Sequence, residues 1–522
     1  MVGKWKVALL ILTLIQDGRG QTTPQGTDPL LVHVLQVEKH PSKIPGPKSL
    51  KDKIAIVGAG PSGIHMAYKL KKAGFKNVVV LEKSGDVGGK SRTIYHRGVP
   101  HEMGTCYTHP DYEEIYELIR EHDAGDILPM PSPSMWVDTP RGKVPLTSSQ
   151  YYAIEARKIK PDMANGTEGL FFQAAIQKYI KLHTSLFGQY EGMLMPRPDR
   201  AKLAATNMTF VEFLRKHDIE ILKAIFLPAA TMQGYGHVDE VSDVYAMMWL
   251  TPNFLTNLLR RDENGESNIK ILSKGFQFLW QEMRRQNNLD VRLNSPVLGI
   301  VRSKRGFILI YRDCNFWRFE HFDFLILTPF MKSLSNVIQF NREENSLFQT
   351  SFHYYFMATL ADTTYGRRSE TPTGYFANNI KSKIDNLVWG FRDSYASLNN
   401  IIGANYSSGI FPGGTDGKKL QSSIYYQMLQ ARPVRAIAEQ MLRDHVNRVE
   451  QAQVVGVQKQ IVWDYFARYP VPDIANGILW DILDIQGKYG IWYIGSSVSF
   501  ESLTAVVGYN NLLLKRMDLP KM

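Results

Sequence analysis

Three glycines near residue 60 have the spacing of a phosphate-binding turn. Gly58, Gly60 and Gly63 stand in G-x-G-x-x-G register between the apolar run KIAIVG at 53–58 and the helical pattern SGIHMAYKLKKAG at 62–74. In such a turn the first glycine permits the tight bend, the second lets the backbone approach a pyrophosphate, and the third lets the helix lie close to the strand. The helix N-terminus then offers free N–H groups to the phosphates.

An acidic residue follows at the distance expected for a dinucleotide site. The second predicted strand, NVVVLEK at 77–83, carries Glu82 nineteen residues after the last glycine, where a carboxylate accepts hydrogen bonds from a ribose diol. A lone glycine fingerprint is weak evidence, but a strand before it, a helix after it and an acid at this distance make it strong. We assign the neighbouring Pro61, Ser62 and Lys83 to the same site. The fingerprint alone does not choose between NAD and FAD.

Four later segments resemble those of FAD-dependent amine oxidases and their relatives. GDVGGKSRT at 85–93 resembles the second glycine motif of that superfamily, and HEMGTCYTH at 101–109 resembles its segment beside the isoalloxazine. VRLNSPVLGI at 291–300 resembles the strand that contacts adenine, and 489–517 resembles the closing strand, turn and helix. The resemblance implies noncovalent FAD, with these further residues at the cofactor: Gly89, Lys90, Ser91, Gly104, Thr105, Val297, Gly495 and Ser496.

Within that superfamily the chain is most similar to polyenoic fatty acid isomerases of bacteria and algae. THPDYEEIYELI, GYGHVDEV, SKGFQFLWQEM and VWDYFARYP come in the same order as in that family, and the resemblance runs from about residue 53 to residue 516. It implies an FAD-dependent isomerase or oxidoreductase that moves a hydride from a bis-allylic carbon of an apolar lipid to another carbon. Tyr107, Tyr235 and His237 are the candidates to line the substrate pocket, and no residue is assigned as acid or base.

The chemistry of such a substrate agrees with what the sequence lacks. A bis-allylic carbon stabilises developing charge by delocalisation, so the protein mainly has to hold that carbon against the cofactor and exclude water. We find no metal-ligand cluster, nucleophile elbow or Cys/His dyad. Two departures from the family are visible: PMPSPSMW at 129–136 lacks a basic residue for a substrate carboxylate, and Ser496 replaces an acidic residue. Carboxylate recognition must come from elsewhere, or the substrate is not a free fatty acid.

Two other functions fit the sequence. An amine or amino-acid oxidase would reoxidise the flavin with oxygen and release peroxide, but the segment SSVSFESLTAVVGYNN at 496–511 has neither a tryptophan for an aromatic cage nor a cysteine for a covalent flavin. A secreted matrix or binding protein could keep the fold without turnover. The intact glycine fingerprint and Glu82 argue against a dead cofactor site.

The order of the motifs predicts an α/β protein with a discontinuous Rossmann-like FAD-binding domain and an inserted α+β substrate domain. We expect the FAD-binding domain to comprise 53–106, 266–330 and 456–522, and the substrate domain to comprise 107–265 and 331–455 of the 522 residues. Ligands of doubly wound sheets bind where the strand order reverses. The substrate should therefore lie between the flavin ring and the inserted domain.

The N-terminus has the pattern of a secretory signal. Lys4 and Lys6 precede the apolar run VALLILTLI, and small residues near Gly20 offer a cleavage site, so we expect 1–20 to be a signal peptide and 21–52 an extended leader. No later apolar run reaches the length of a membrane span. Export to the extracellular space would make three sequons glycan acceptors, at Asn165, Asn207 and Asn405.

Charge and cysteine content exclude some classes and leave others open. The chain carries 61 basic and 50 acidic residues, but the formal charge of +11 is dispersed and no basic face interleaved with aromatics indicates nucleic-acid binding. With only two cysteines, Cys106 and Cys314, the chain is not a disulfide scaffold, and their pairing stays open. The oligomeric state stays open as well.

Overall fold

A computed structural model gives the fold of most of the chain. The expected signal sequence, most of the leader and the sequon at Asn405 lie outside the described residues. The structure describes residues 43–140, 142–190, 195–258, 268–364, 366, 372–394, 410–412 and 419–518. Among the described helices, none combines the length and apolar composition needed to cross a bilayer.

A five-stranded parallel sheet joins the beginning, the middle and the end of the chain. Its order is β20–β13–β1–β2–β9, and all neighbouring strands run parallel. β1, in the centre, is buried along Ile54 to Val57, as an apolar run flanked on both sides by other strands and covered by helices requires. The strands are β1 Lys53–Val57, β2 Asn77–Leu81, β9 Asp290–Arg292, β13 Phe324–Leu327 and β20 Ile491–Tyr493.

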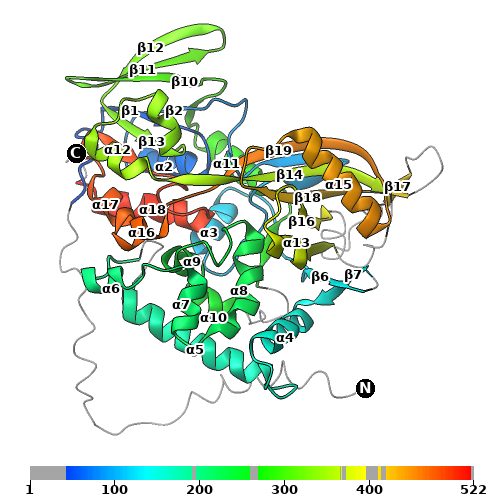
Figure 1. Cartoon of the computed structure of the whole chain (residues 1–522). Coiled ribbons are helices and arrows are strands. Elements are labelled where there is room, and N and C mark those ends of the chain that lie inside the picture. Colours follow the sequence, from blue (N-terminus) through cyan, green and yellow to red (C-terminus); the bar gives the residue numbers. More distant parts are fainter. Residues whose placement is uncertain are drawn as a thin grey trace.

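Helices from distant parts of the chain cover this sheet (Figure 1). α2 (Pro61–Lys72) follows β1 directly, with proline in its first turn, and Gly74 at φ +93° follows its end. α18 (Leu503–Arg516), at the end of the chain, lies against α2, and α11 (Phe276–Gln286) contacts α2 as well. The predicted α/β fold class is therefore confirmed.

A three-stranded antiparallel sheet projects from the five-stranded sheet, at the top of Figure 1. It contains β10 (Val297–Ser303), β11 (Gly306–Asp313) and β12 (Phe316–Phe322) in that order. One face buries Phe307 and Tyr311 against the rest of the protein. The other face points away from the core.

A second large sheet of eight strands builds the opposite part of the molecule. Its order is β19–β14–β18–β16–β15–β6–β7, with β17 paired to β18. β19 begins at Val454, so the expected domain boundary between residues 455 and 456 falls inside one strand; the other domain limits stay predictions. The strands are β6 Ser134–Thr139, β7 Gly142–Thr147, β14 Phe352–Thr364, β15 Thr373–Phe376, β16 Val388–Arg392, β17 Ile410–Pro412, β18 Lys419–Leu429 and β19 Val454–Arg468.

The remaining elements are mostly helices, several of which form the lower layer in Figure 1. Thr147 and Thr209 cap α4 and α7 through capping boxes. The helices are α3 Glu113–Glu121, α4 Ser148–Ile159, α5 Glu168–Phe187, α6 Arg200–Ala204, α7 Phe210–Lys216, α8 Lys223–Ala229, α9 Asp243–Trp249, α10 Pro252–Leu258, α12 Arg342–Phe348, α13 Ala377–Ser382, α15 Arg435–Glu450, α16 Val471–Ala475 and α17 Ile478–Asp484. Short 3-10 helices lie at Glu220–Leu222, Thr231–Gln233 and Met331–Asn336. Two further antiparallel pairs are the hairpin of β3 Thr93–His96 with β4 Val99–Glu102, and β5 Ile127–Pro129 with the distant β8 Lys270–Leu272.

Candidate functional site

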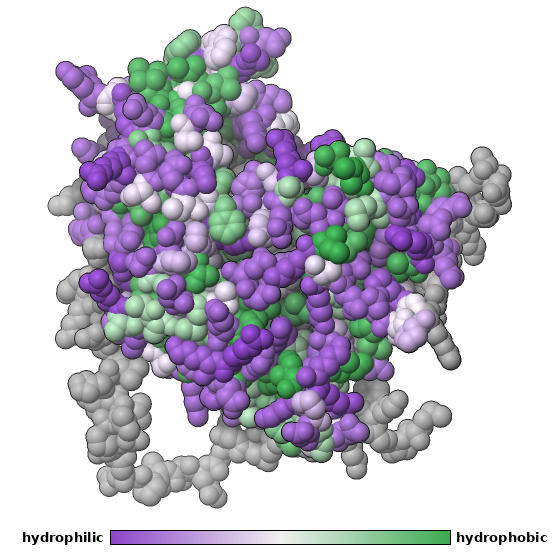
Figure 2. Space-filling model, viewed as in Figure 1, coloured by the Kyte–Doolittle hydropathy of each residue, from purple (hydrophilic) through white to green (hydrophobic). Residues whose placement is uncertain are grey.

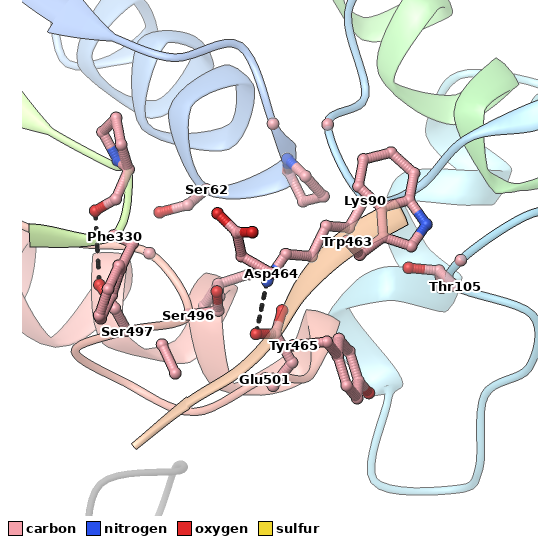
Figure 3. Close-up of a pocket in the computed structure, with 18 of the residues that line it drawn as sticks. Ser62, Lys90, Thr105, Phe330, Trp463, Asp464, Tyr465, Ser496, Ser497 and Glu501 are labelled. Carbon is pink, nitrogen blue, oxygen red and sulfur yellow. Dashed lines mark hydrogen bonds and ion pairs between the residues drawn. The ribbon is translucent and has the colours of Figure 1, made fainter. Parts of the chain in front are cut away.

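One cavity of about 700 Å³ is lined by residues from both large sheets (Figure 3). We distinguish two walls by the residues that form them. The glycine wall consists of Gly58, Gly60, Pro61, Ser62, Glu82, Lys83, Gly89, Lys90, Val297, Gly495 and Ser496. The aromatic wall consists of Tyr107, Met232, Tyr235, Trp249, Phe356, Tyr375, Tyr426, Trp463 and Tyr465.

The glycine wall brings two predicted glycine motifs into backbone contact. A Cβ on Gly89, whose φ is +51°, would lie only 2.9 Å from the Cα of Gly60. Gly60 is also the N-cap of α2, where no side chain caps the helix and the first turn carries no acid. The free N–H groups of that turn and the bare backbone beside them form a cradle suited to a diphosphate.

Gly63 and Ser91 support this wall from behind and do not line the cavity. A Cβ on Gly63 would lie 2.0 Å from the carbonyl oxygen of Gly58, so the helix and the turn touch there. The buried Ser91 side chain shares a hydrogen bond of 3.0 Å with Thr105, which itself lines the cavity. Both residues therefore shape the site without facing it.

Glu82 is fixed at the cavity by three donors. Its carboxylate accepts hydrogen bonds from the Ala59 N–H at 2.7 Å, the Ser84 N–H at 2.8 Å and the Ser84 hydroxyl at 2.6 Å. A carboxylate offers about four lone-pair sites, so it can still accept from a ribose hydroxyl. The geometry fits the role that the spacing predicts.

A buried carboxylate that the sequence analysis missed also faces the cavity. Glu501 forms an ion pair with Lys90, with 2.7 Å between the Lys90 Nζ and a carboxylate oxygen, as Figure 3 shows. The Glu501 side chain is 7% exposed. Tyr235 donates its hydroxyl to the Glu501 carbonyl oxygen at 3.1 Å. No motif marks Glu501, because it lies in the irregular turn before α18 and meets Lys90 only through the fold.

The segment from Glu102 to Tyr107 is held from two sides. A Cβ on Gly104 would lie 1.9 Å from the Lys90 carbonyl oxygen. From the eight-stranded sheet, Trp463 donates to the Met103 carbonyl oxygen at 2.7 Å, and Arg392 donates to that of Cys106 at 3.1 Å. This backbone is therefore a fixed surface between the two walls. Cys106 and Cys314 are free thiols.

The aromatic wall is a chain of contacting rings. Tyr235 lies 4.8 Å from Trp249 and 6.1 Å from Tyr465, and Phe356 lies 5.4 Å from both Tyr465 and Tyr426, measured between ring centroids. Their segments are far apart in the sequence, so strand pairing in the eight-stranded sheet brings most of them together.

Burial keeps the tyrosines of this wall uncharged. It raises the pKa of Tyr375 to about 12 and the pKa values of Tyr107, Tyr235 and Tyr465 well above their ordinary range. Burial likewise raises the pKa of the Cys106 thiol. The wall therefore offers neutral, largely apolar surface with a few hydroxyl groups.

His237 differs from its expected position. Tyr107 and Tyr235 line the cavity as predicted, but His237 does not. It lies beyond the turn at Gly236, where φ is +77°, against Trp389 in a separate small pocket. The reversal of the chain at the glycine gives adjacent residues different surroundings, which the sequence pattern GYGH does not reveal.

The two walls fit the FAD that the sequence resemblance implies. The cradle of Gly60 and Gly89, the N-terminus of α2 and the fixed Glu82 are suited to the diphosphate and ribose, and Val297 lines the cavity where the resemblance expects adenine. The flavin end would then lie toward the segment at Gly104 and the aromatic wall. Within the described residues, no group of His, Cys, Asp and Glu side chains is arranged to hold a metal ion.

Comparisons with known proteins agree with this geometry. A family model described as flavin containing amine oxidoreductase matches residues 61–353. The polyenoic fatty acid isomerase of Ptilota filicina is 24% identical over 502 residues, which covers 89% of this chain and 94% of that protein. Among solved structures, a CLA-producing fatty acid isomerase from P. acnes has a TM-score of 0.70 at 20% identity, covering 90% of this chain and 99% of its own. Wild-type putrescine oxidase bound to putrescine has a TM-score of 0.60 at 16% identity, covering 89% and 98%.

Proposed function

The chain belongs to the family of flavin-containing amine oxidoreductases and is an FAD-dependent isomerase or oxidoreductase, and we propose that its substrate is a polyunsaturated fatty acid or a similar lipid. In the proposed reaction a hydride leaves one carbon of the lipid and returns to another, so that a double bond moves without net oxidation. When bound, FAD supplies the two-electron acceptor. The observation that carries the proposal is that a neutral, largely aromatic wall lines the same cavity as the glycine cradle.

The residues of this wall have the properties that such a substrate requires. Rings such as the buried Trp249 and the half-buried Phe356 give an acyl chain apolar surface, and they exclude water from the reacting carbon. No histidine lines the described cavity, and the tyrosine hydroxyl groups stay protonated. Positioning of the carbon therefore replaces acid–base catalysis in this proposal.

The cavity also offers a cation for a lipid carboxylate. Arg432 lines it, and within the described chain this guanidinium forms no ion pair. The segment at 129–136, which leads into β6, lacks the basic residue that the resemblance would place there, so we propose that Arg432 binds the carboxylate. Arg432→Met should raise KM for a free fatty acid about fivefold, as expected for a partly exposed ion pair, and leave KM for its methyl ester unchanged. Arg435→Met is the matched control, because Arg435 does not line the cavity.

The alternative of an amine oxidase is less well supported by the cavity. Putrescine oxidase shares the fold, but a cationic amine binds most tightly where a carboxylate without another partner adds to aromatic rings. Glu82 already accepts three hydrogen bonds, and Glu501 is paired with Lys90. In this proposal Glu82 binds the ribose and Glu501 is paired with Lys90, whereas Asp464, which also lines the cavity, is 58% exposed to solvent.

Anaerobic mixing of the purified yellow protein with linoleate, arachidonate and a panel of amines tests the proposal. The fatty acids should perturb the flavin absorbance and be converted to conjugated isomers, which ultraviolet absorbance and product analysis detect. Peroxide release with an amine in air would instead identify an amine oxidase. A protein that is colourless after expression with riboflavin and does not bind FAD in a titration would contradict an enzymatic function and favour a binding role.

We also propose that the chain is exported. The pattern of residues 1–20 supports it, and the sequon residues Asn165 and Asn207 are exposed. When the chain is expressed in secreting eukaryotic cells, the protein recovered from the culture medium should start near Gln21. It should lose mass on treatment with a peptide N-glycosidase. Retention in the cell with an intact N-terminus would contradict the proposal.

A further inference from the structure

The β10–β12 sheet gathers apolar side chains on its outward face. Across its antiparallel register Val301 stands opposite Ile308, Ile310 opposite Phe319, and Arg312 opposite Trp317. Side chains of directly paired residues, and of every second residue along a strand, point to the same side of a sheet. The inward side is already filled by buried residues such as Phe307 and Tyr311. The outward side therefore collects Val301, Ile308, Ile310, Trp317 and Phe319, which we call the outer face.

This face is exposed to solvent. The exposed fractions are 51% for Val301, 37% for Ile308, 54% for Trp317 and 69% for Phe319, and the nearby Phe316 is 69% exposed. In Figure 2 hydrophobic surface gathers at the top of the molecule, over the position of this sheet, with hydrophilic surface beside it. Single exposed apolar residues are ordinary, but a contiguous set that includes two large aromatic rings marks an interaction surface.

Basic residues lie at one end of the outer face and on it. Lys304 and Arg305 form the turn between β10 and β11, and Arg312 lies on the face with its guanidinium 5.4 Å from the Trp317 ring centroid. None of these three cations forms an ion pair within the described chain, and no carboxylate belongs to the outward register positions of the three strands. The acids of this sheet are engaged elsewhere: Glu320 pairs with Arg292 at 2.6 Å, and Asp313 with Arg318 at 3.2 Å. The outer face is thus apolar and positively charged.

We propose that the outer face docks the protein on an anionic phospholipid surface. Aromatic rings are suited to the boundary between headgroups and acyl chains, and nearby Lys and Arg side chains bind anionic headgroups. A second copy of the chain fits less well, because a twofold contact through this face would bring Lys304, Arg305 and Arg312 toward their own copies. The inference does not depend on which substrate the cavity takes.

Vesicle sedimentation of the FAD-loaded protein tests the proposal. The protein should sediment with vesicles of phosphatidylcholine and phosphatidylserine, much less with phosphatidylcholine alone, and less at high salt. Lys304→Gln with Arg305→Gln should lower the partition coefficient at least about tenfold, given about a fivefold contribution from each basic residue at an anionic surface. Trp317→Ser with Phe319→Ser should lower it by a similar factor, about tenfold, because the apolar contact is lost.

Matched controls separate docking from misfolding. Leu170→Ser with Val434→Ser removes two apolar residues of similar exposure, 54% and 59%, that lie outside the outer face, and should leave the partition coefficient unchanged. All variants should keep their bound FAD and their unfolding temperature. Cys314, exposed in the β11–β12 turn, can carry an environment-sensitive fluorophore, since burial raises the pKa of the other thiol, Cys106. Its emission should shift to the blue on anionic vesicles.

Two results would overturn the proposal. One is equal sedimentation of the wild-type protein and both outer-face variants. The other is a wild-type dimer in light scattering that Trp317→Ser with Phe319→Ser converts to a monomer, without any binding to vesicles. That second result would assign the outer face to contact between copies.

Discussion

The glycine wall and the aromatic wall of the cavity are built in different ways. The glycine wall is built mainly from the backbone of residues 58–90, as in the approach of Gly60 to Gly89 and the hydrogen bond from Ala59 to Glu82, and later segments add Val297, Gly495 and Ser496. The aromatic wall uses side chains from strands and loops far apart in the sequence. A cofactor with a fixed diphosphate can be bound by a local motif, whereas a pocket for a variable chain depends on the tertiary arrangement.

The largest expected effects come from alanine substitutions of two glycines in the phosphate-binding turn, one of which should lower stability and the other FAD affinity. Gly63→Ala should lower the free energy of unfolding by about 3 kcal/mol, because the new Cβ would lie 2.0 Å from a backbone oxygen that cannot move easily. Gly60→Ala meets only the Gly89 Cα at 3.8 Å, so the apoprotein should keep its stability. Its FAD affinity should nevertheless fall at least about tenfold, because the methyl group occupies the diphosphate cradle. Thermal unfolding and FAD titration measure the two effects, and equal behaviour of both variants would contradict the cradle.

A second test addresses the acid of the glycine wall. Glu82→Gln should weaken FAD binding about ten- to one-hundredfold, since an amide NH₂ would face an N–H donor and a charged acceptor is lost. Ser84→Ala removes one of the three donors to Glu82 and should have a smaller effect. Fluorescence titration with FAD gives both dissociation constants. Unchanged affinity in Glu82→Gln would show that this carboxylate does not contact the cofactor.

His109 and Glu102 are held neutral by burial, and they should make the stability of the fold depend on pH in opposite directions. Burial lowers the pKa of His109 from 6.5 to about 3, so only the unfolded chain takes up this proton and stability falls as pH drops below 6.5. Burial raises the pKa of Glu102 from 4.5 to about 7, so stability falls as pH rises from 4.5 to 7. His109→Phe should remove the first dependence and Glu102→Gln the second, each about 1.4 kcal/mol per pH unit.

Denaturant unfolding of the wild type and both variants between pH 4 and 7 measures how the free energy of unfolding changes with pH. Each slope should correspond to about one proton. The difference curves of the two variants against the wild type should have opposite signs. Difference curves that slope in the same direction would show that one of the two groups is charged in the folded protein.

The smallest effect is expected at Cys106, between the two walls. Its thiol has a raised pKa, and we interpret it as a small, half-buried side chain without a chemical role. Cys106→Ala should keep FAD binding and change kcat by less than about threefold. A larger loss of kcat with normal FAD affinity would assign the thiol a direct part in the reaction.

Most residues predicted at the cofactor line the cavity, whereas the sequence indicated few residues of the aromatic wall. Among the glycine-wall predictions, Gly58, Gly60, Glu82, Lys90 and Gly495 all line the cavity, since each belongs to a short motif whose geometry is local. The other residues predicted at the cofactor also line the cavity, except Gly63 and Ser91, which do not. Of the aromatic wall, only Tyr107 and Tyr235 were proposed, and His237 faces another pocket.

The sequence by itself determined the α/β class, the FAD-binding turn and the order of the motifs, because glycine spacing, apolar strands and helical periodicity act over a few residues. Only the tertiary structure decided which aromatic rings form the second wall, how Glu501 meets Lys90, and that the apolar residues of β10–β12 share one exposed face. These features depend on strand register and on contacts between residues far apart in the chain, which no local pattern encodes.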